Sequence, residues 1–148
     1  MKPRLRFVVA TAGLTSVFLA QAADATLDAA AKEPGAIVTS SGLVYRSLQD
    51  GSGDSPKASD RVKVNYRGTF PDGREFDSSY KRKQAIEFPL SGVIRCWTEG
   101  VQRMKVGGKA KLTCPAAIAY GERGAGGGLI PANATLLFEV ELLGINAK

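Results

Sequence analysis

The feature that most constrains this chain is the segment 62–80, in which a strand turns and comes back. Val62, Val64 and Tyr66 alternate with polar residues, which is the period of a strand with one buried face. The Asp72-Gly73 pair then supplies the positive φ angle that a tight hairpin needs. The segment therefore predicts an antiparallel hairpin with one apolar face.

The returning strand of this hairpin contains a conflict. Phe76 and Asp77 are adjacent, so in an extended strand their side chains would point to opposite faces of the sheet. Both side chains could serve one site only if the strand bends or bulges at this point. We therefore predict a distortion of the strand at this pair, and a functional site beside it.

The rest of the chain supplies further strands and one helix. Residues 95–104 place Trp97, Val101 and Met104 on one apolar face, as in a short amphipathic helix. Alternating or apolar runs predict strands over 43–48, 85–90, 109–114 and 134–145, of which the second contains a proline that confines it to a sheet edge or a bulge. The predicted fold class is α+β, with five or six antiparallel strands and one short helix.

The beginning of the chain has the pattern of a signal peptide. Lys2, Arg4 and Arg6 precede a mostly apolar run over 7–19, and Ala20-Gln21-Ala22 fits a small-x-small cleavage site. No second apolar run follows, so we expect no membrane anchor. We expect export to the bacterial periplasm, with secretion from the cell as the alternative.

Once a signal peptide over 1–22 is set aside, the remaining chain has the size of one domain. Residues 23–40 contain an alanine-rich piece and Pro34-Gly35, which predict a flexible leader, with one short helix as the alternative. Residues 41–148 are predicted to form the single domain. Because the leader is too short for a helical dimerisation arm, we expect a monomer.

The composition excludes several kinds of chemistry. The chain has no histidine, which rules out Ser-His-Asp and Cys-His catalysis and any histidine-based metal site. The glycine run within 124–128 lacks the lysine and the hydroxyl residue of a phosphate loop. The net charge is +6, but the sequence contains no run of basic residues interleaved with aromatic residues. We therefore expect no nucleic-acid partner. We expect neither a cofactor nor a metal.

Cys96 and Cys114 are the two cysteines of the chain. In an oxidising compartment the pair can form a disulfide, and it can equally remain two buried thiols that pack as small apolar side chains. The sequence leaves both states open. Neither thiol is expected to be catalytic, because no histidine is present to act as its base.

Five blocks of the sequence resemble the signature of the FKBP-type peptidyl-prolyl cis-trans isomerases. They occur in the family's order over residues 41–146, as 64–68, 76–79, 93–100, 119–121 and 130–138. The leading residues 41–45 further resemble the exported bacterial branch related to macrophage infectivity potentiators. The chain departs from the family at Cys96, where glycine is usual, and in the glycine run within 124–128.

The resemblance implies a twisted antiparallel half-barrel wrapped around the short helix, with an apolar pocket between them. Tyr120 and the backbone N–H of Ile94 would hold substrate carbonyls, and Asp77 would face the rotating bond or position Tyr66. Together with Phe138 these are the residues to which the resemblance assigns catalysis. Trp97 would form the floor, and the other substrate-binding residues would be Phe76, Phe88, Val93, Ile130, Ile86 and Arg82.

The implied activity is cis-trans isomerisation of X-Pro peptide bonds in exported proteins, which assists their folding. Such a bond turns slowly because twisting breaks amide resonance, and no covalent step is needed to accelerate it. The expected partners are proline-containing unfolded or secreted polypeptides and tacrolimus-type macrolide inhibitors. The alternative is a chaperone-like module that binds proline peptides without turnover.

Overall fold

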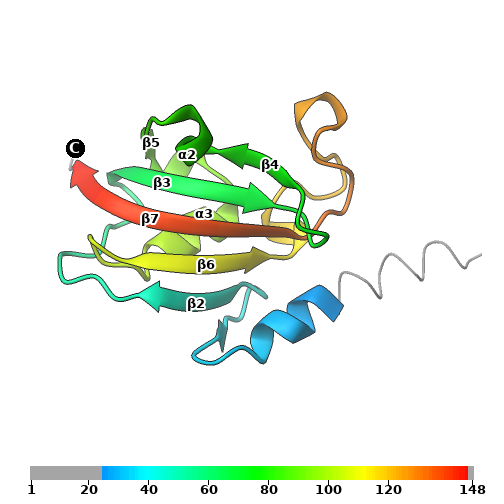
Figure 1. The fold of residues 1–148 in the computed structure, drawn as a ribbon, viewed down its shortest axis with the longest axis horizontal. Helices are drawn as coiled ribbons and strands as arrows, with labels where there is room; N and C mark the ends of the chain where they lie inside the picture. The colour runs from blue at the N-terminus through cyan, green and yellow to red at the C-terminus, as the bar shows by residue number, and fades with distance from the viewer. Residues whose placement is uncertain (1–24, 147–148) are drawn as a thin grey trace, which may run out of the picture.

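The computed structural model describes residues 25–146, in which a curved sheet covers the helix α3 (Figure 1). Every strand pair is antiparallel, in the order β1-β2-β6-β7-β3-β4 with β5 also paired to β3. The sheet is open, since β1 and β4 end this order. Its strands are β1 (Ile37–Val38), β2 (Val44–Gln49), β3 (Arg61–Thr69), β4 (Glu75–Ser78), β5 (Ile86–Pro89), β6 (Lys109–Cys114) and β7 (Leu136–Asn146).

The helical elements are short. They comprise residues 25–31, α2 (Ser79–Arg82), α3 (Arg95–Val101) and the 3₁₀ turns η2 (Leu90–Gly92), η3 (Ala116–Ile118) and η4 (Gly126–Gly128). This arrangement confirms the predicted α+β class. The sheet has seven strands instead of five or six, because the two-residue strand β1 adds itself to the outer edge of β2.

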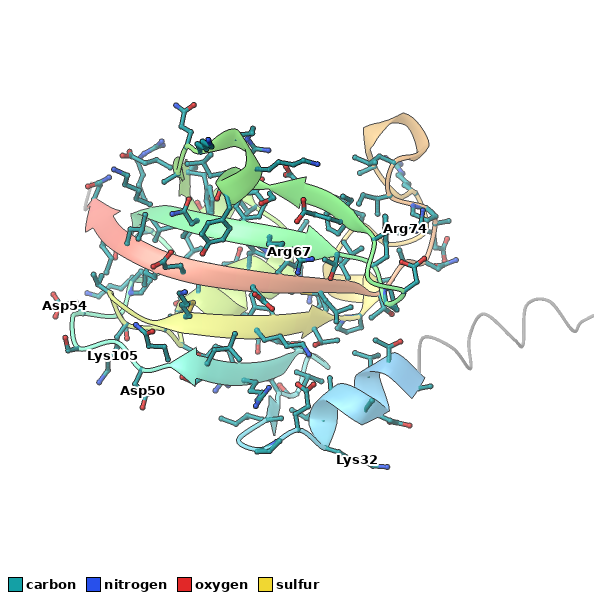
Figure 2. All side chains as sticks on the ribbon, in the orientation of Figure 1. Lys32, Asp50, Asp54, Arg67, Arg74 and Lys105 are labelled. Carbon is teal, nitrogen blue, oxygen red and sulfur yellow. A yellow bond between two sulfur atoms is a disulfide. The ribbon has the colours of Figure 1, made fainter. Side chains whose placement is uncertain are left out.

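The two central strands explain where the core lies. Exposed and buried residues alternate along β3, with Val62, Val64 and Tyr66 buried, as the period of two predicts. β7 pairs with β3 from Arg61 to Thr69 and buries its own alternate side chains on the same face. Arg67 stands on the opposite, outer face of the sheet (Figure 2). The core is therefore enclosed between the inner face of the sheet and α3.

The helix α3 packs closely on β6. A Cβ at Gly100 would lie 2.8 Å from a methyl carbon of Leu112, so the glycine permits this approach. The helix ends at Val101 and not at Met104 as predicted, because the following N–H groups donate to carbonyls three residues back, which tightens the chain into turns. Met104 nevertheless stays buried in the core.

The segment before the domain lies along the edge of the sheet. Residues 25–31 are helical, as the alternative for the leader proposes, and Ala30 is buried. The Glu33 carboxylate accepts a hydrogen bond from Lys111 Nζ at 2.9 Å and lies 3.7 Å from Arg46. The flexibility of the leader and its boundary remain predictions, and the predicted signal peptide over 1–22 lies outside the described residues. Within residues 25–146 no helix has the length and apolarity needed to cross a membrane.

Candidate active site

The distortion predicted at Phe76 and Asp77 is a β-bulge. In the pairing of β3 with β4, Gly68 lies opposite Asp77 and Thr69 lies opposite Glu75, which leaves Phe76 as an extra residue. Because of this insertion, the adjacent side chains of Phe76 and Asp77 line one cavity. The predicted distortion of the strand is confirmed, and a cavity lies beside it; the functional role of this cavity stays a prediction.

A cavity of about 480 Å³ lies beside this bulge, between the sheet and the start of α3. Strands β3, β4, β5 and β7, the turn before α3, α3 itself and the loop after η3 all supply side chains to it. Gly92 lines it although the sequence did not single this residue out. The residues around the cavity are Tyr66, Phe76, Asp77, Ile86, Phe88, Gly92, Val93, Ile94, Trp97, Tyr120 and Phe138.

Aromatic rings packed around Trp97 form the inner part of the cavity. The rings of Tyr66 and Phe138 meet the indole edge to face, with centroids 5.2 Å and 5.3 Å away. Phe88 packs at 5.3 Å in a tilted arrangement, and Phe76 meets Phe138 edge to face at 5.7 Å. Offset and edge-to-face contacts of this kind are the favoured geometry for aromatic pairs. They hold the ring walls in place around an apolar space suited to a flat, compact ligand group.

A hydrogen-bonded network fixes the carboxylate at the cavity wall. Asp77 accepts hydrogen bonds from the Tyr66 hydroxyl and from the Arg82 guanidinium, and the Ser78 N–H donates to it at 2.9 Å. Arg82 also donates to the Tyr66 hydroxyl at 3.1 Å. Burial favours a higher pKa for Asp77, but these hydrogen bonds and the charge of Arg82 outweigh it and hold the pKa below its usual value. The cavity therefore presents an ionised, oriented carboxylate at neutral pH.

The helix α2 places Arg82 in this network. The Ser78 side chain caps the start of α2 by accepting from the Lys81 N–H, and Lys83 closes the helix in the left-handed conformation at φ 58°. The expected residue Arg82 thus does not line the cavity itself but holds Asp77 from behind. This is a positioning role, whereas the resemblance places Arg82 among the substrate-binding residues.

The two tyrosines of the cavity keep their protons at neutral pH. Burial and the hydrogen bond to Asp77 raise the pKa of Tyr66. Burial and the nearby negative charge of Asp77 raise the pKa of Tyr120. Both hydroxyls can therefore donate hydrogen bonds. Tyr66 donates to Asp77, whereas the Tyr120 hydroxyl makes no hydrogen bond to any of residues 25–146.

A second donor at the cavity is also without an acceptor. The backbone N–H of Ile94, the residue before α3, makes no hydrogen bond in the part of the chain that the structure describes, and its side chain lines the cavity. An unpaired backbone N–H is costly when it is dry. Ile94 and Tyr120 therefore provide two donors that a polar ligand group in this cavity could satisfy.

Ile130 is the other expected site residue that does not line the cavity. Its side chain is buried in the core, and its backbone pairs with Ala125 through two hydrogen bonds of 3.0 Å that close the glycine-rich loop. Gly124 adopts φ +68°, and a Cβ there would come within 2.1 Å of the Ile130 carbonyl oxygen. Only glycine fits this turn, and its missing side chain lets the loop close against the Ile130 carbonyl.

The importance of Gly68 emerges only from the tertiary structure. A Cβ at this position would lie 2.6 Å from a ring carbon of Phe76 and 3.0 Å from one of Phe138, so both rings use the space that the glycine leaves. An isolated glycine inside an alternating strand is the sequence signal for such a close approach. Gly68 is such a glycine within the block 64–68, but the sequence did not indicate which aromatic rings would pack against it.

The two cysteines lie beneath the site and form a disulfide. Cys96 follows the first residue of α3 and Cys114 ends β6, with both side chains fully buried and their Cα atoms 5.9 Å apart. The link connects the helix that carries Trp97 to the strand that leads toward Tyr120. Among the described residues no cluster of three or more cysteine and carboxylate side chains has the arrangement of a metal site.

Comparison with known proteins shows which family this sequence matches. Residues 53–143 match the family described as FKBP-type peptidyl-prolyl cis-trans isomerase. The sequence is 52% identical over 115 residues to the FKBP-type peptidyl-prolyl cis-trans isomerase FkpA of Escherichia coli K12, covering 78% of this chain and 42% of that protein. It is 43% identical over 129 residues to the peptidyl-prolyl cis-trans isomerase Mip of Coxiella burnetii, covering 87% of this chain and 56% of the relative.

The same similarity extends to a solved structure. The crystal structure of FkpA from Escherichia coli matches with a TM-score of 0.81 and 39% identity, covering 99% of this chain and 76% of the other. The chain thus spans less than half the length of the curated FkpA relative.

Proposed function

Because the chain belongs to the family of FKBP-type peptidyl-prolyl cis-trans isomerases, we propose that it catalyses cis-trans isomerisation of X-Pro bonds in exported polypeptides and so assists their folding. The observation that carries the proposal is the cavity itself. It combines aromatic walls, an oriented carboxylate and two unpaired hydrogen-bond donors. These are the features that a bound prolyl peptide requires.

The reaction needs no covalent intermediate. The barrier to turning an X-Pro bond is about 18–20 kcal/mol because the twisted amide loses its resonance. A dry cavity disfavours the polar planar amide relative to the less polar twisted one, so binding energy from the proline ring lowers the barrier. Each 1.36 kcal/mol of this preference corresponds to about a tenfold rate increase.

Each residue has a defined part in this proposal. The proline ring rests over Trp97 between the aromatic walls, where a flat apolar group is best packed. The Ile94 N–H and the Tyr120 hydroxyl donate to substrate carbonyls and hold the chain on either side of the rotating bond. Asp77 presents its negative charge to the amide carbon, and Tyr66 and Arg82 hold that carboxylate in position.

The partners follow from the same cavity. We propose proline-containing unfolded or secreted polypeptides as substrates and tacrolimus-type macrolides as competitive ligands. Export, to the bacterial periplasm or beyond, is proposed from the signal-peptide pattern over 1–22. The protein is proposed to act as a monomer.

An exchange assay on a proline peptide tests the proposal directly. NMR exchange or a refolding reaction limited by a prolyl bond should be accelerated by the protein, and a tacrolimus-type macrolide should abolish the acceleration. If the folded protein leaves the exchange rate unchanged, the proposal fails. Suppression of aggregation that persists in Asp77→Ala would then support the binding module instead.

A further inference from the structure

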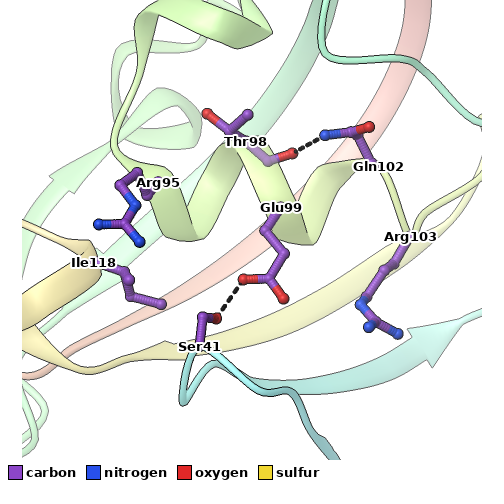
Figure 3. A pocket seen from close by; sticks show the side chains of 7 residues that line it. All are labelled: Ser41, Arg95, Thr98, Glu99, Gln102, Arg103 and Ile118. Carbon is purple, nitrogen blue, oxygen red and sulfur yellow. Dashed lines mark hydrogen bonds between the residues drawn. The ribbon is translucent and has the colours of Figure 1, made fainter.

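A second cavity of about 470 Å³ is lined mainly by residues of α3 and of the turn that follows it (Figure 3). We call it the α3 pocket. It is formed by Arg95, Thr98, Glu99, Gln102 and Arg103, with Ser41 and Ile118 facing them from two other segments. The figure shows the two arginines at opposite ends of the pocket, with Glu99 between them.

The charges of the α3 pocket are not balanced. The single carboxylate, Glu99, accepts a hydrogen bond from the Ser41 hydroxyl at 2.5 Å, on the side of the leader. Arg95 and Arg103 are exposed, and neither guanidinium has an ion pair or a hydrogen bond within residues 25–146. The Gln102 side-chain amide donates a hydrogen bond to the Thr98 carbonyl at 2.8 Å. The pocket therefore offers two unpaired cations with their donor groups free.

Residues that are neighbours in the sequence line the two cavities. Ile94 lines the aromatic cavity, and the next residue, Arg95, lines the α3 pocket. On the facing segment, Ile118 belongs to the α3 pocket and Tyr120 to the aromatic cavity. An extended polypeptide advances about 3.3–3.6 Å per residue. A chain with a carbonyl on the Ile94 N–H therefore brings residues close to the prolyl bond within reach of Arg95.

We propose that the α3 pocket is a substrate subsite that takes an acidic side chain of the bound polypeptide, close in sequence to the isomerised prolyl bond. The proposal rests on the proposed isomerase function and adds a preference to it. A carboxylate can accept two parallel hydrogen bonds from either guanidinium in a bidentate ion pair, which a neutral or basic side chain cannot do. Because the guanidiniums are exposed, the gain is that of surface ion pairs and falls with added salt.

The test uses matched peptides that each contain one proline. Glu, Gln or Lys is placed in turn at each of the three positions before and the three after the prolyl bond. Both kcat/KM and the dissociation constant are measured at low salt, so that the preference can be read from binding even without turnover. At one position we expect the Glu peptide to have a kcat/KM about two- to fivefold higher than the Gln peptide and a dissociation constant lower by the same factor. The Lys peptide should bind more weakly than the Gln peptide at that position.

Variants of the protein assign the effect to the pocket. In Arg95→Gln combined with Arg103→Gln, the ratio of Glu to Gln peptide should fall to about one, and in Arg95→Glu it should reverse in favour of Lys. Lys57→Gln removes an exposed cation that lines neither cavity, and it should keep the original ratio. Equal values for Glu and Gln at every position, or a preference that survives the double variant, would overturn the subsite. Failure of the isomerase function itself would appear separately, as absent turnover of the Gln peptides.

Discussion

The Tyr66 hydroxyl donates a hydrogen bond to the Asp77 carboxylate across the β3–β4 pair, at the bulge that turns Asp77 into the cavity. Without the extra residue Phe76, the alternation of the strand would direct one of these adjacent side chains away from the site. The bulge therefore creates the contact between an aromatic wall and a charged group. Arg82 completes it from α2 by bonding to both partners.

Tyr120→Phe should separate catalysis from stability. The Tyr120 hydroxyl, on a side chain with 39% of its surface exposed, makes no hydrogen bond within residues 25–146, so the fold does not depend on it. We expect the free energy of unfolding to stay within about 0.5 kcal/mol. The loss of one substrate hydrogen bond should lower kcat/KM by about two- to tenfold. Urea unfolding and the proline-peptide assay measure the two quantities.

Tyr80→Phe is the matched control for that variant. Its hydroxyl is bonded to Glu141 at 3.0 Å and its side chain does not line the aromatic cavity. Its kcat/KM should equal that of the unaltered protein. Equal kcat/KM values for the Tyr120→Phe and unaltered proteins would show that the Tyr120 hydroxyl does not contribute to the reaction.

The stability supplied by Asp77 should depend on pH. Its folded pKa is lower than the unfolded value of about 3.9, so the ionised carboxylate stabilises the fold above that pH. This stabilisation is lost as the pH falls through the folded pKa. We expect Asp77→Asn to unfold at lower denaturant concentration than the unaltered protein at pH 7, and the difference between the two midpoints to shrink at a pH below the unfolded pKa. Midpoints that differ equally at both pH values would contradict the assignment.

Gly68→Ala should damage the site by crowding it. The added methyl carbon would overlap the rings of Phe76 and Phe138, which must shift into the cavity or out of their packing. We expect a loss of about 1–3 kcal/mol in the free energy of unfolding, together with a lower kcat/KM. Gly144→Ala, on β7, meets no atom within 4 Å and should change both quantities little. Equal effects of the two substitutions would mean that the rings can yield at no cost.

Reduction of the Cys96–Cys114 disulfide should weaken the fold. The link closes a loop of 18 residues, which in the chain-entropy model is worth about 3 kcal/mol. The double variant Cys96→Ala, Cys114→Ala should have a free energy of unfolding that is lower by a corresponding amount. Reducing agent should have no further effect on the stability of this variant. Thiol titration of the unfolded, unreduced protein provides the direct check. Two reactive thiols per chain would show that the bridge does not form.

Local patterns in the sequence already specified most of the framework. Alternation predicted the strands β3 and β7, the apolar face of 95–104 predicted the helix, and the adjacency of Phe76 and Asp77 predicted a bend or bulge beside a site. These features depend on backbone geometry within a few residues, so they can be recognised without knowledge of the rest of the chain. The missing histidines likewise limit the chemistry that the side chains can carry out.

Contacts between distant segments were decided only by the tertiary structure. It paired Cys96 with Cys114, joined Arg82 to the Tyr66 hydroxyl, and buried Ile130 in the core instead of at the cavity. Each outcome depends on how close two elements come once the sheet has curved over α3, and no local pattern contains that distance. The sequence therefore determined which elements form and which chemistry is available, and the packing of the sheet on the helix decided which side chains meet.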